Sequence, residues 1–138
     1  MRSILIDAGP LIALFDKSDS YHKRAIAFIK TVKVPVYTTW PVITEALHML
    51  DFSTQVQLNL LTWIERGGLN LIEISEEQLF RIIELTQKFD DVPMDLADAT
   101  LIVASELKGI RQIASVDGDF YIYRDIRNRY LSNIFMES

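Results

Sequence analysis

The sequence predicts an α/β fold built around a parallel sheet of four to five strands. Its expected strands are short apolar runs without alternation, such as Ile4-Leu5-Ile6, a pattern typical of strands buried on both faces. Helical segments separate these runs, and no hairpin signature joins two strands directly. Parallel strands need such long connections, so helices are expected to cover the sheet. Because the 138 residues contain no repeat or linker, we expect one domain over 1–138.

Turn and capping residues mark the elements of the first half. The expected order is a strand at 4–6, a helix at 11–15, a polar turn at 16–20, a helix at 21–30, a strand at 34–38, and helices at 42–50 and 54–64. Pro10 opens the first helix, because the N–H that proline lacks would be unpaired in a first turn. Pro35 is tolerated at the start of a strand. Ser53 or Thr54 caps the last helix, and Gly67 follows its basic end.

The second half continues the alternation. The expected order is a strand at 69–74, a helix at 75–89, a loop at 90–94, a helix at 95–107, a strand at 110–116 and an edge strand at 130–135. Ser75 and Gln78 have the spacing of a capping box at the start of a helix. Asp95 is a suitable N-cap for the next helix, and Gly109 follows its end.

Composition and charge exclude several classes of protein. The absence of cysteine excludes a disulfide scaffold, thiol catalysis, an iron–sulfur cluster and a zinc–thiolate site. The net charge of −5 argues against a general basic surface for nucleic acid. Apolar runs such as Leu11–Phe15 are far shorter than the ~20 residues that cross a bilayer, and the apolar start ends at Asp7, too early for a signal peptide. We therefore expect a cytoplasmic protein without a membrane segment.

Two aspartates follow strands of the predicted sheet. Asp7 comes directly after the first strand, and Asp117 directly after the fourth. In parallel α/β sheets, ligands bind outside the carboxyl ends of the strands. Aspartate is also common in the turn that leaves a strand, so each residue alone fits either a turn or a site.

Further acids lie near the start of the helix at 95–107 and within the helix at 42–50. Asp95 and Asp98 are three residues apart and share a helix face. Four acids crowd within nine positions here: Asp90, Asp91, Asp95 and Asp98. Capping of the helix needs only one or two of them. Glu45 lies at the edge of an apolar helical stripe, where it is either solvated or directed into a cleft.

Carboxylates gathered in one pocket repel one another unless a cation compensates them. Hard oxygen ligands suit Mg²⁺ or Mn²⁺, and no cysteine or histidine-pair spacing indicates zinc. Two such ions can activate water and stabilise both oxygens of a phosphodiester displacement. They would also bridge an acidic protein to a polyanion, which reconciles a nucleic-acid substrate with the net charge of −5.

Four short motifs occur in order along the chain: Ile6–Phe15, Ile43–Ala46, Met94–Ala99 and Ser115–Phe120. Together they resemble the PIN domain family and, within it, the VapC-like ribonuclease toxins of toxin–antitoxin systems. The resemblance extends from Ile4 to about Phe120. It implies a single PIN domain over 1–138, a three-layer α/β/α sandwich, and metal-dependent cleavage of RNA by water.

The resemblance also implies site residues and partners. The implied catalytic acids are Asp7, Glu45, Asp98 and Asp117. The implied ligands of Mg²⁺ or Mn²⁺ are these four together with Asp95 and Asp119. Ser115 would support one carboxylate, at a position where threonine is commoner, and Gly118 replaces a frequent basic residue. The implied partners are an RNA substrate, an antitoxin protein and a second copy in a homodimer.

The same residues allow other functions. A PIN-like module that binds RNA or protein without cutting is one alternative, and a PIN nuclease of RNA maturation is another. A phosphotransfer role for Asp7 is disfavoured, since Gly9 stands where haloacid dehalogenase-like phosphatases usually carry a second aspartate. The two histidines, His22 and His48, form no traceable serine–histidine–aspartate arrangement. His22 is expected to support packing and His48 to lie at the surface.

The roles of several basic and aromatic residues stay open. They either contact RNA or belong to an ordinary surface and core: Arg111, Arg124, Arg127, Arg129, Phe120, Tyr121, Tyr123 and Tyr130. Those expected in the core or in an oligomer interface are Phe28, Trp40, Leu60 and Trp63.

Overall fold

A five-stranded, fully parallel sheet forms the centre of the computed structural model, which describes residues 2–136. The strands are β1 (Ile4–Ile6), β2 (Val36–Thr38), β3 (Asn70–Leu71), β4 (Gln112–Ala114) and β5 (Ser132–Asn133). They lie in the order β3-β2-β1-β4-β5, with Ile4 in register with Val36 on one side and Gln112 on the other. The predicted parallel sheet of four to five strands is confirmed.

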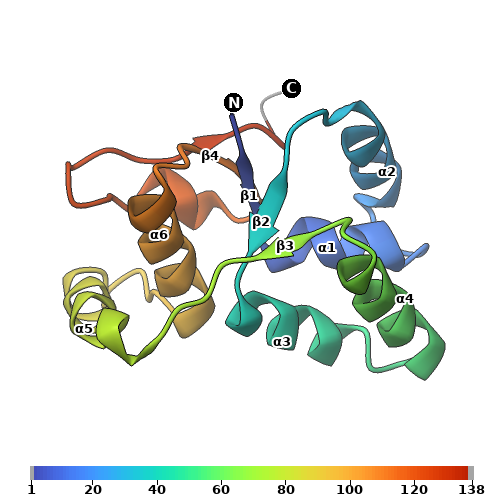
Figure 1. Ribbon diagram of the computed structural model, residues 1–138, viewed down its shortest axis with the longest axis horizontal. Coiled ribbons are helices and arrows are strands. Elements are labelled where there is room, and N and C mark those ends of the chain that lie inside the picture. Colours follow the sequence, from blue (N-terminus) through green and yellow to red (C-terminus); the bar gives the residue numbers. More distant parts are fainter. Residues whose placement is uncertain (1, 137–138) are drawn as a thin grey trace.

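Helices cover both faces of this sheet. They are α1 (Ala8–Phe15), α2 (His22–Thr31), α3 (Trp40–Met49), α4 (Thr54–Glu65), α5 (Leu79–Lys88) and α6 (Leu96–Lys108), with 3-10 turns η1 (Glu76–Gln78) and η2 (Gly118–Tyr121). Figure 1 shows α1, α2 and α4 on one side of the sheet and α5 and α6 on the other, with α3 below the carboxyl end of β1. The predicted three-layer α/β/α arrangement is confirmed. Within residues 2–136, no helix combines the length and apolar character needed to cross a membrane.

Two helices begin earlier than predicted. The first starts at Ala8 instead of residue 11, because Asp7 is its N-cap and accepts a hydrogen bond from the Ala8 N–H at 2.8 Å. Pro10 therefore lies inside the first turn, where its missing N–H is still harmless. Likewise α3 begins at Trp40 and contains Pro41 in its first turn. In both places the proline lies inside the first turn of the helix and does not mark where the helix begins.

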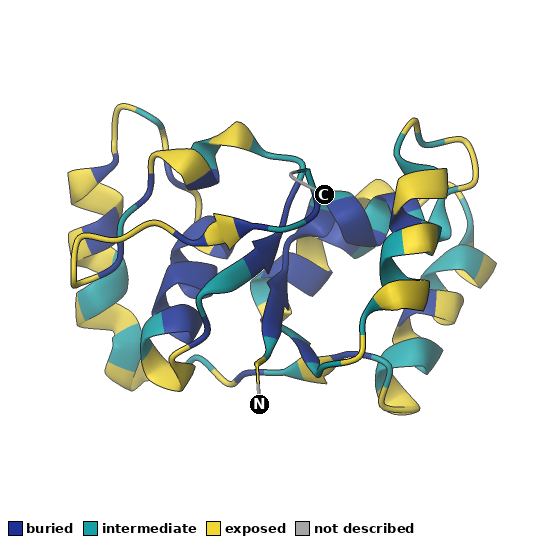
Figure 2. Cartoon of the chain, turned by 90° about the horizontal axis from the view of Figure 1, so that it is seen from above, coloured by how far each residue is buried: buried dark blue, intermediate teal, exposed yellow. Residues whose placement is uncertain are grey.

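The strands are shorter than the apolar runs that contain them. The run at 69–74 contributes only Asn70–Leu71 to the ladder, and the run at 110–116 only Gln112–Ala114. All three residues of β1 are buried, which explains the unalternated apolar pattern. Figure 2 shows the same burial along the central strands and on the inner sides of the helices. α6 is buried continuously from Ala97 to Ser105.

Three of the four residues assigned to core or interface pack against other residues of the chain. Leu60 is fully buried, Trp63 packs on Phe15 with ring centroids 5.7 Å apart, and Phe28 packs on Phe135 at 5.5 Å. Trp40 differs, because 57% of its surface is exposed. It is not a core residue.

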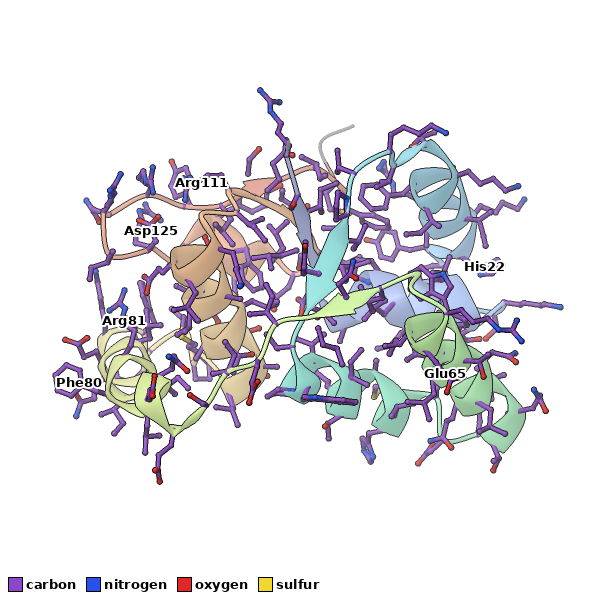
Figure 3. All side chains as sticks on the ribbon, viewed as in Figure 1. His22, Glu65, Phe80, Arg81, Arg111 and Asp125 are labelled. Carbon is purple, nitrogen blue, oxygen red and sulfur yellow. The ribbon has the colours of Figure 1, made fainter. Side chains whose placement is uncertain are left out.

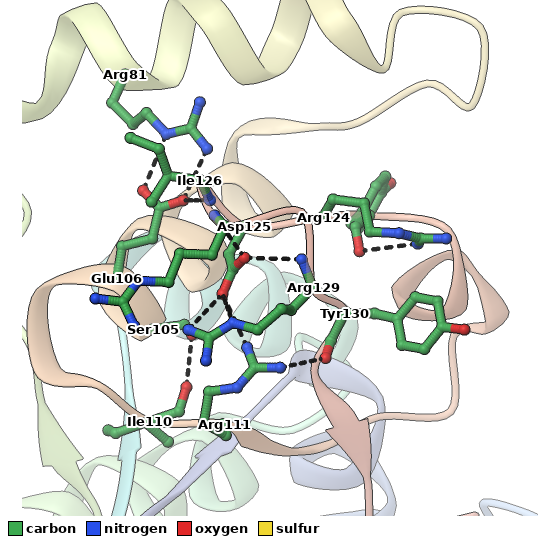
Figure 4. A network of polar contacts seen from close by, with 12 residues as sticks. Arg81, Ser105, Glu106, Ile110, Arg111, Arg124, Asp125, Ile126, Arg129 and Tyr130 are labelled. Atoms are coloured by element: carbon green, nitrogen blue, oxygen red, sulfur yellow. Dashed lines mark hydrogen bonds and ion pairs between the residues drawn. The ribbon is translucent and has the colours of Figure 1, made fainter.

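A buried carboxylate organises the segment between η2 and β5 (Figure 4). Asp125 accepts hydrogen bonds from the side chains of Arg111 at 2.9 Å and Arg129 at 3.2 Å, and from the backbone N–H groups of Arg127 and Arg129 at 2.9 Å each. Burial alone would raise the pKa of Asp125, but these hydrogen bonds and the Arg129 charge outweigh it, so the pKa lies below its ordinary value. Arg111 and Arg129, two candidate RNA contacts, are thus engaged in holding this segment.

A second ion pair joins α5 to α6 beside this segment. Arg81 donates two hydrogen bonds to the Glu106 carboxylate, at 2.9 and 2.7 Å, in the bidentate geometry that suits a guanidinium. The same carboxylate accepts the Ile126 N–H at 2.8 Å. Nearby, the Arg124 guanidinium lies 4.0 Å from the centre of the Tyr130 ring. These contacts fasten the chain between η2 and β5 to the outer side of α6 (Figure 4).

Candidate metal centre

Three aspartates from distant parts of the chain meet at the carboxyl end of the sheet. Asp7 follows β1, Asp117 follows β4, and Asp98 lies in the first turn of α6. Carboxylate oxygens of the three lie within 4.8 Å of one another. Because β1 and β4 are neighbouring parallel strands, the residues that follow them lie close together at the same edge of the sheet. We refer to Asp7, Asp98 and Asp117 as the carboxylate cluster.

Asp7 is both a helix cap and a member of the carboxylate cluster, the two roles that its position after a strand allowed. Its Oδ1 caps α1, and its Oδ2 accepts a hydrogen bond from the Ser115 hydroxyl at 3.0 Å. The Ser115 hydroxyl oxygen in turn accepts the Asp117 N–H at 2.9 Å. Ser115 itself is held by Asn133, whose side-chain amide donates to the Ser115 carbonyl at 2.9 Å. One serine therefore orients two members of the carboxylate cluster.

Asp98 is fixed by two hydrogen bonds, one from its backbone N–H and one to its carboxylate. Its backbone N–H donates to the Asp95 carboxylate at 2.8 Å, which makes Asp95 the N-cap of α6 as predicted. Its Oδ2 accepts a hydrogen bond from the Tyr123 hydroxyl at 2.9 Å. Tyr123 is fully buried and packs edge-on against Phe120, so the base-stacking alternative is wrong for both rings. A buried tyrosine needs a partner for its hydroxyl, and the sequence does not show that Tyr123 is buried.

Three further predicted acids surround the cluster without joining it. Asp119 is half-buried, and its N–H donates to Asp117 at 2.9 Å. Glu45 and Asp95 are exposed residues of α3 and of the start of α6. Among residues 2–136, the acids whose oxygens converge are those of the carboxylate cluster alone. Asp90 and Asp91 are exposed in the turn before α6 and lie outside it.

Burial and mutual repulsion disfavour the charged forms of two cluster members. Burial raises the pKa of Asp7 from 3.8 to about 7, against the opposing hydrogen bonds from Ala8 and Ser115. Burial and the charges of Asp7 and Asp95 raise the pKa of Asp98 to about 8. The pKa of Glu45, outside the cluster, is also raised. Partial burial is the main cause, and the charges of Asp95 and Asp117 add to it.

The donor set fits a hard divalent cation. The cluster offers carboxylate oxygens only, and within the described residues none of its three members forms an ion pair with lysine or arginine. Mg²⁺ and Mn²⁺ prefer such oxygen ligands. A cation at this place would supply the positive charge that the surrounding protein does not.

Comparison with protein-family models finds a match to the PIN domain over residues 4–126. The chain belongs to the PIN domain family. Two solved structures share the fold of this PIN domain. One is VapC20 of Mycobacterium tuberculosis, a sarcin–ricin loop cleaving toxin, with 20% identity, a TM-score of 0.80, and coverage of 86% of this chain and 93% of that chain.

The other is a chain of VapBC2 from Rickettsia felis, a complex bound to a DNA fragment from its promoter. It has 14% identity, a TM-score of 0.63, and coverage of 95% of this chain and 98% of that chain. No curated protein sequence matched significantly. The predicted PIN family is thus confirmed, and the likeness to the two solved structures supports the same fold.

The histidines of this PIN domain have separate environments. The Nδ1–H of His22 donates to the Ala13 carbonyl at 2.7 Å and ties α2 to α1, which supports the predicted packing role. Figure 3 shows His22 on the α1–α2 side of the molecule. His48 is exposed on α3, as expected.

The raised pKa values predict how stability changes with pH when no metal is bound. Between about pH 4 and pH 7 to 8, the folded chain binds more protons at Asp7 and Asp98 than the unfolded chain does. The free energy of unfolding must therefore fall as the pH rises through this window. In EDTA, we expect the melting temperature to be about 3 to 8 °C lower at pH 8 than at pH 5.5.

Asp98→Asn should flatten this dependence, whereas Asp91→Asn, at an exposed acid outside the cluster, should leave it unchanged. Circular dichroism melts at both pH values measure the effect. A metal-free protein that is more stable at pH 8 than at pH 5.5 would contradict the electrostatic account of the cluster.

Proposed function

We propose that this PIN domain is a Mg²⁺- or Mn²⁺-dependent endoribonuclease that hydrolyses RNA phosphodiester bonds. The convergence of Asp7, Asp98 and Asp117, which form no ion pair with lysine or arginine among residues 2–136, carries the proposal. Membership in the PIN domain family supports it, and so does the fold shared with VapC20, a toxin that cleaves the sarcin–ricin loop.

In this proposal the catalytic acids are Asp7, Glu45, Asp98 and Asp117, and Asp95 and Asp119 assist in holding the metal. When bound, the ion supplies positive charge beside the phosphodiester and lowers the pKa of a water molecule. The chain's own contribution is orientation. Ser115 fixes the Asp7 carboxylate and the Asp117 backbone, and Tyr123 fixes the Asp98 carboxylate. Burial keeps these groups in a fixed arrangement before any ligand arrives.

We further propose that the protein is the toxin of a toxin–antitoxin pair, acting on RNA in the cytoplasm. An antitoxin protein and a second copy of the chain are its proposed partners. The fold shared with a chain of the VapBC2 complex supports the antitoxin as a partner.

Cleavage of a labelled mixed-sequence RNA tests the proposal. Cutting is expected with Mn²⁺, and no cutting with EDTA or with the Asp98→Asn variant in Mn²⁺. Mn²⁺ should also raise the melting temperature of the wild type and not that of the variant, because ligand binding to the folded state is stabilising. A folded, partner-free protein that neither cuts RNA nor gains stability from Mn²⁺ would instead favour a binding module.

Ser115→Ala should reduce kcat/KM for RNA cleavage roughly tenfold, because the groups behind metal ligands typically matter to that extent. The variant loses the hydroxyl that contacts both Asp7 and Asp117. It should also raise the Mn²⁺ concentration needed for half-maximal activity. Ser115→Thr keeps a hydroxyl and should retain most activity. Equal Mn²⁺ requirements in wild type and Ser115→Ala would refute this positioning role.

A further inference from the structure

Trp40 presents its indole to solvent at the edge of the acidic site. It is the first residue of α3 and exposes 57% of its surface, unlike Trp63, which packs on Phe15. It lines a cleft of about 690 Å³, whose other lining residues include Glu45, Asp95 and Leu96. The cleft is wide open to solvent, so it offers a surface on which a ligand can lie and not an enclosed pocket.

This cleft adjoins the carboxylate cluster. Its lining includes Asp95, Leu96 and Ala97, the three residues that precede Asp98 in the chain. Asp95 accepts the N–H of Asp98. A ligand in the cleft therefore lies next to the groups that we propose to hold the metal.

The chemistry of the walls selects the part of a nucleic acid that fits there. Glu45 and Asp95 lie where we propose that the metal is held, so the phosphate of the RNA belongs beside them and not at Trp40. Trp40 and Leu96 offer uncharged surface, and Leu96 exposes 56% of its own. Nucleobases stack on such aromatic rings whatever their sequence. His48, also on the wall, has ring nitrogens that donate or accept a hydrogen bond at a base edge.

We propose that Trp40 and Leu96 form a nucleobase subsite, in which a base of single-stranded RNA stacks on the indole while its backbone passes the carboxylate cluster. This inference rests on the proposed function and adds to it residues that position a base. Single-stranded RNA suits the test, because bases in a duplex are already stacked and paired. The cleft adjoins the groups that we propose to hold the metal, which favours a base of the bound RNA over a protein side chain as the occupant.

Fluorescence of Trp40 tests binding at this subsite. The chain has two tryptophans, so Trp63→Phe leaves Trp40 as the sole indole, and stopped-flow mixing records its fluorescence before cutting proceeds. A short single-stranded RNA of mixed sequence, with Mg²⁺ present, should quench this fluorescence, and the same sequence as a duplex should not. An indole that does not respond to the single-stranded RNA would overturn the subsite.

Steady-state cleavage tests its contribution to catalysis. Trp40→Ala should raise KM roughly 5- to 50-fold, in line with the loss of one stacked base, and should leave kcat within about threefold. Trp40→Phe should recover part of the loss, whereas Trp40→Leu, which is apolar but not aromatic, should not. Phe80→Ala is the matched control, because Phe80 is 74% exposed on the outer side of α5 (Figure 3) and does not line the cleft.

The outcomes separate this inference from the proposed function. A wild type that does not cut RNA refutes the nuclease, while quenching by RNA still supports the base subsite. A wild type that cuts, with KM unchanged in Trp40→Ala, overturns the subsite alone. Light scattering identifies the competing occupant: a dimer that Trp40→Ala converts to monomer, without quenching by RNA, assigns Trp40 to contact with a second copy.

Discussion

Asp7→Asn is expected to lower kcat/KM for RNA cleavage by at least about 100-fold while the chain stays folded. Groups behind metal ligands are worth about 10- to 100-fold, so the loss of a ligand charge should cost at least the upper value. Asparagine is as good an N-cap as aspartate, so the contact to the Ala8 N–H survives. The side-chain amide can also donate to the Ser115 hydroxyl, which replaces the hydrogen bond that Asp7 accepts.

The same variant should be more stable than the wild type at pH 8 without metal. Burial raises the pKa of Asp7 to about 7, so ionising this group in the folded chain costs free energy that asparagine does not incur. Asp91→Asn, which makes the same charge change at an exposed position, should alter neither activity nor stability. Initial cleavage rates and thermal melts in EDTA measure both effects. If Asp7→Asn unfolds, Asp7 is a turn-stabilising residue and the cluster needs another explanation.

The two halves of the site differed in how far the sequence predicted them. Asp7 and Asp117 were found because each directly follows a strand, and neighbouring parallel strands end at the same edge of the sheet. Helical spacing placed Asp98 on one face with Asp95, and the resemblance to the PIN family assigned Asp98 to the site. Local patterns of this kind carry through to the structure because strand and helix geometry leave few alternatives.

The residues that orient the acids were harder to find. Tyr123 was one of several aromatics without a distinguishing pattern, and Asn133 lies in the run predicted as an edge strand. Their partners, Asp98 and Ser115, are 25 and 18 residues away in sequence. Such contacts depend on the path of the segment between η2 and β5, which has no helical or strand periodicity to predict it.

Local chemistry alone also left the basic residues ambiguous. Arg111 and Arg129 have the composition of a phosphate-binding patch, yet both bind Asp125. Nothing in the sequence distinguishes an aspartate that is buried beside two arginines from one in a solvated charge run. The distinction is tertiary, since Arg111 precedes β4 while Asp125 lies 14 residues later.

Asp125→Ala should destabilise the protein by about 3 kcal/mol, the largest loss of stability that we expect from a single polar substitution here. Asp125 is 4% exposed and accepts hydrogen bonds from two arginines and two backbone N–H groups. Alanine removes this charged acceptor from the part-buried N–H groups of Arg127 and Arg129, and a hydrogen bond to a charged group is worth about 1.5 to 3 kcal/mol. The arginine side chains are partly exposed and can return to water, so their charges add little to the cost.

Asp125→Asn separates these contributions. Its amide oxygen still accepts from the backbone, so we expect a loss of about 1 kcal/mol, which reflects the arginine pairs alone. Urea unfolding at pH 7 gives both values, and hydrogen exchange of the Arg127 and Arg129 amides should accelerate in Asp125→Ala and not in Asp125→Asn. Equal stabilities of the two variants would mean that charge, not backbone hydrogen bonding, holds this segment. The path that carries Tyr123 to Asp98 and Asn133 to Ser115 would then depend on the arginines.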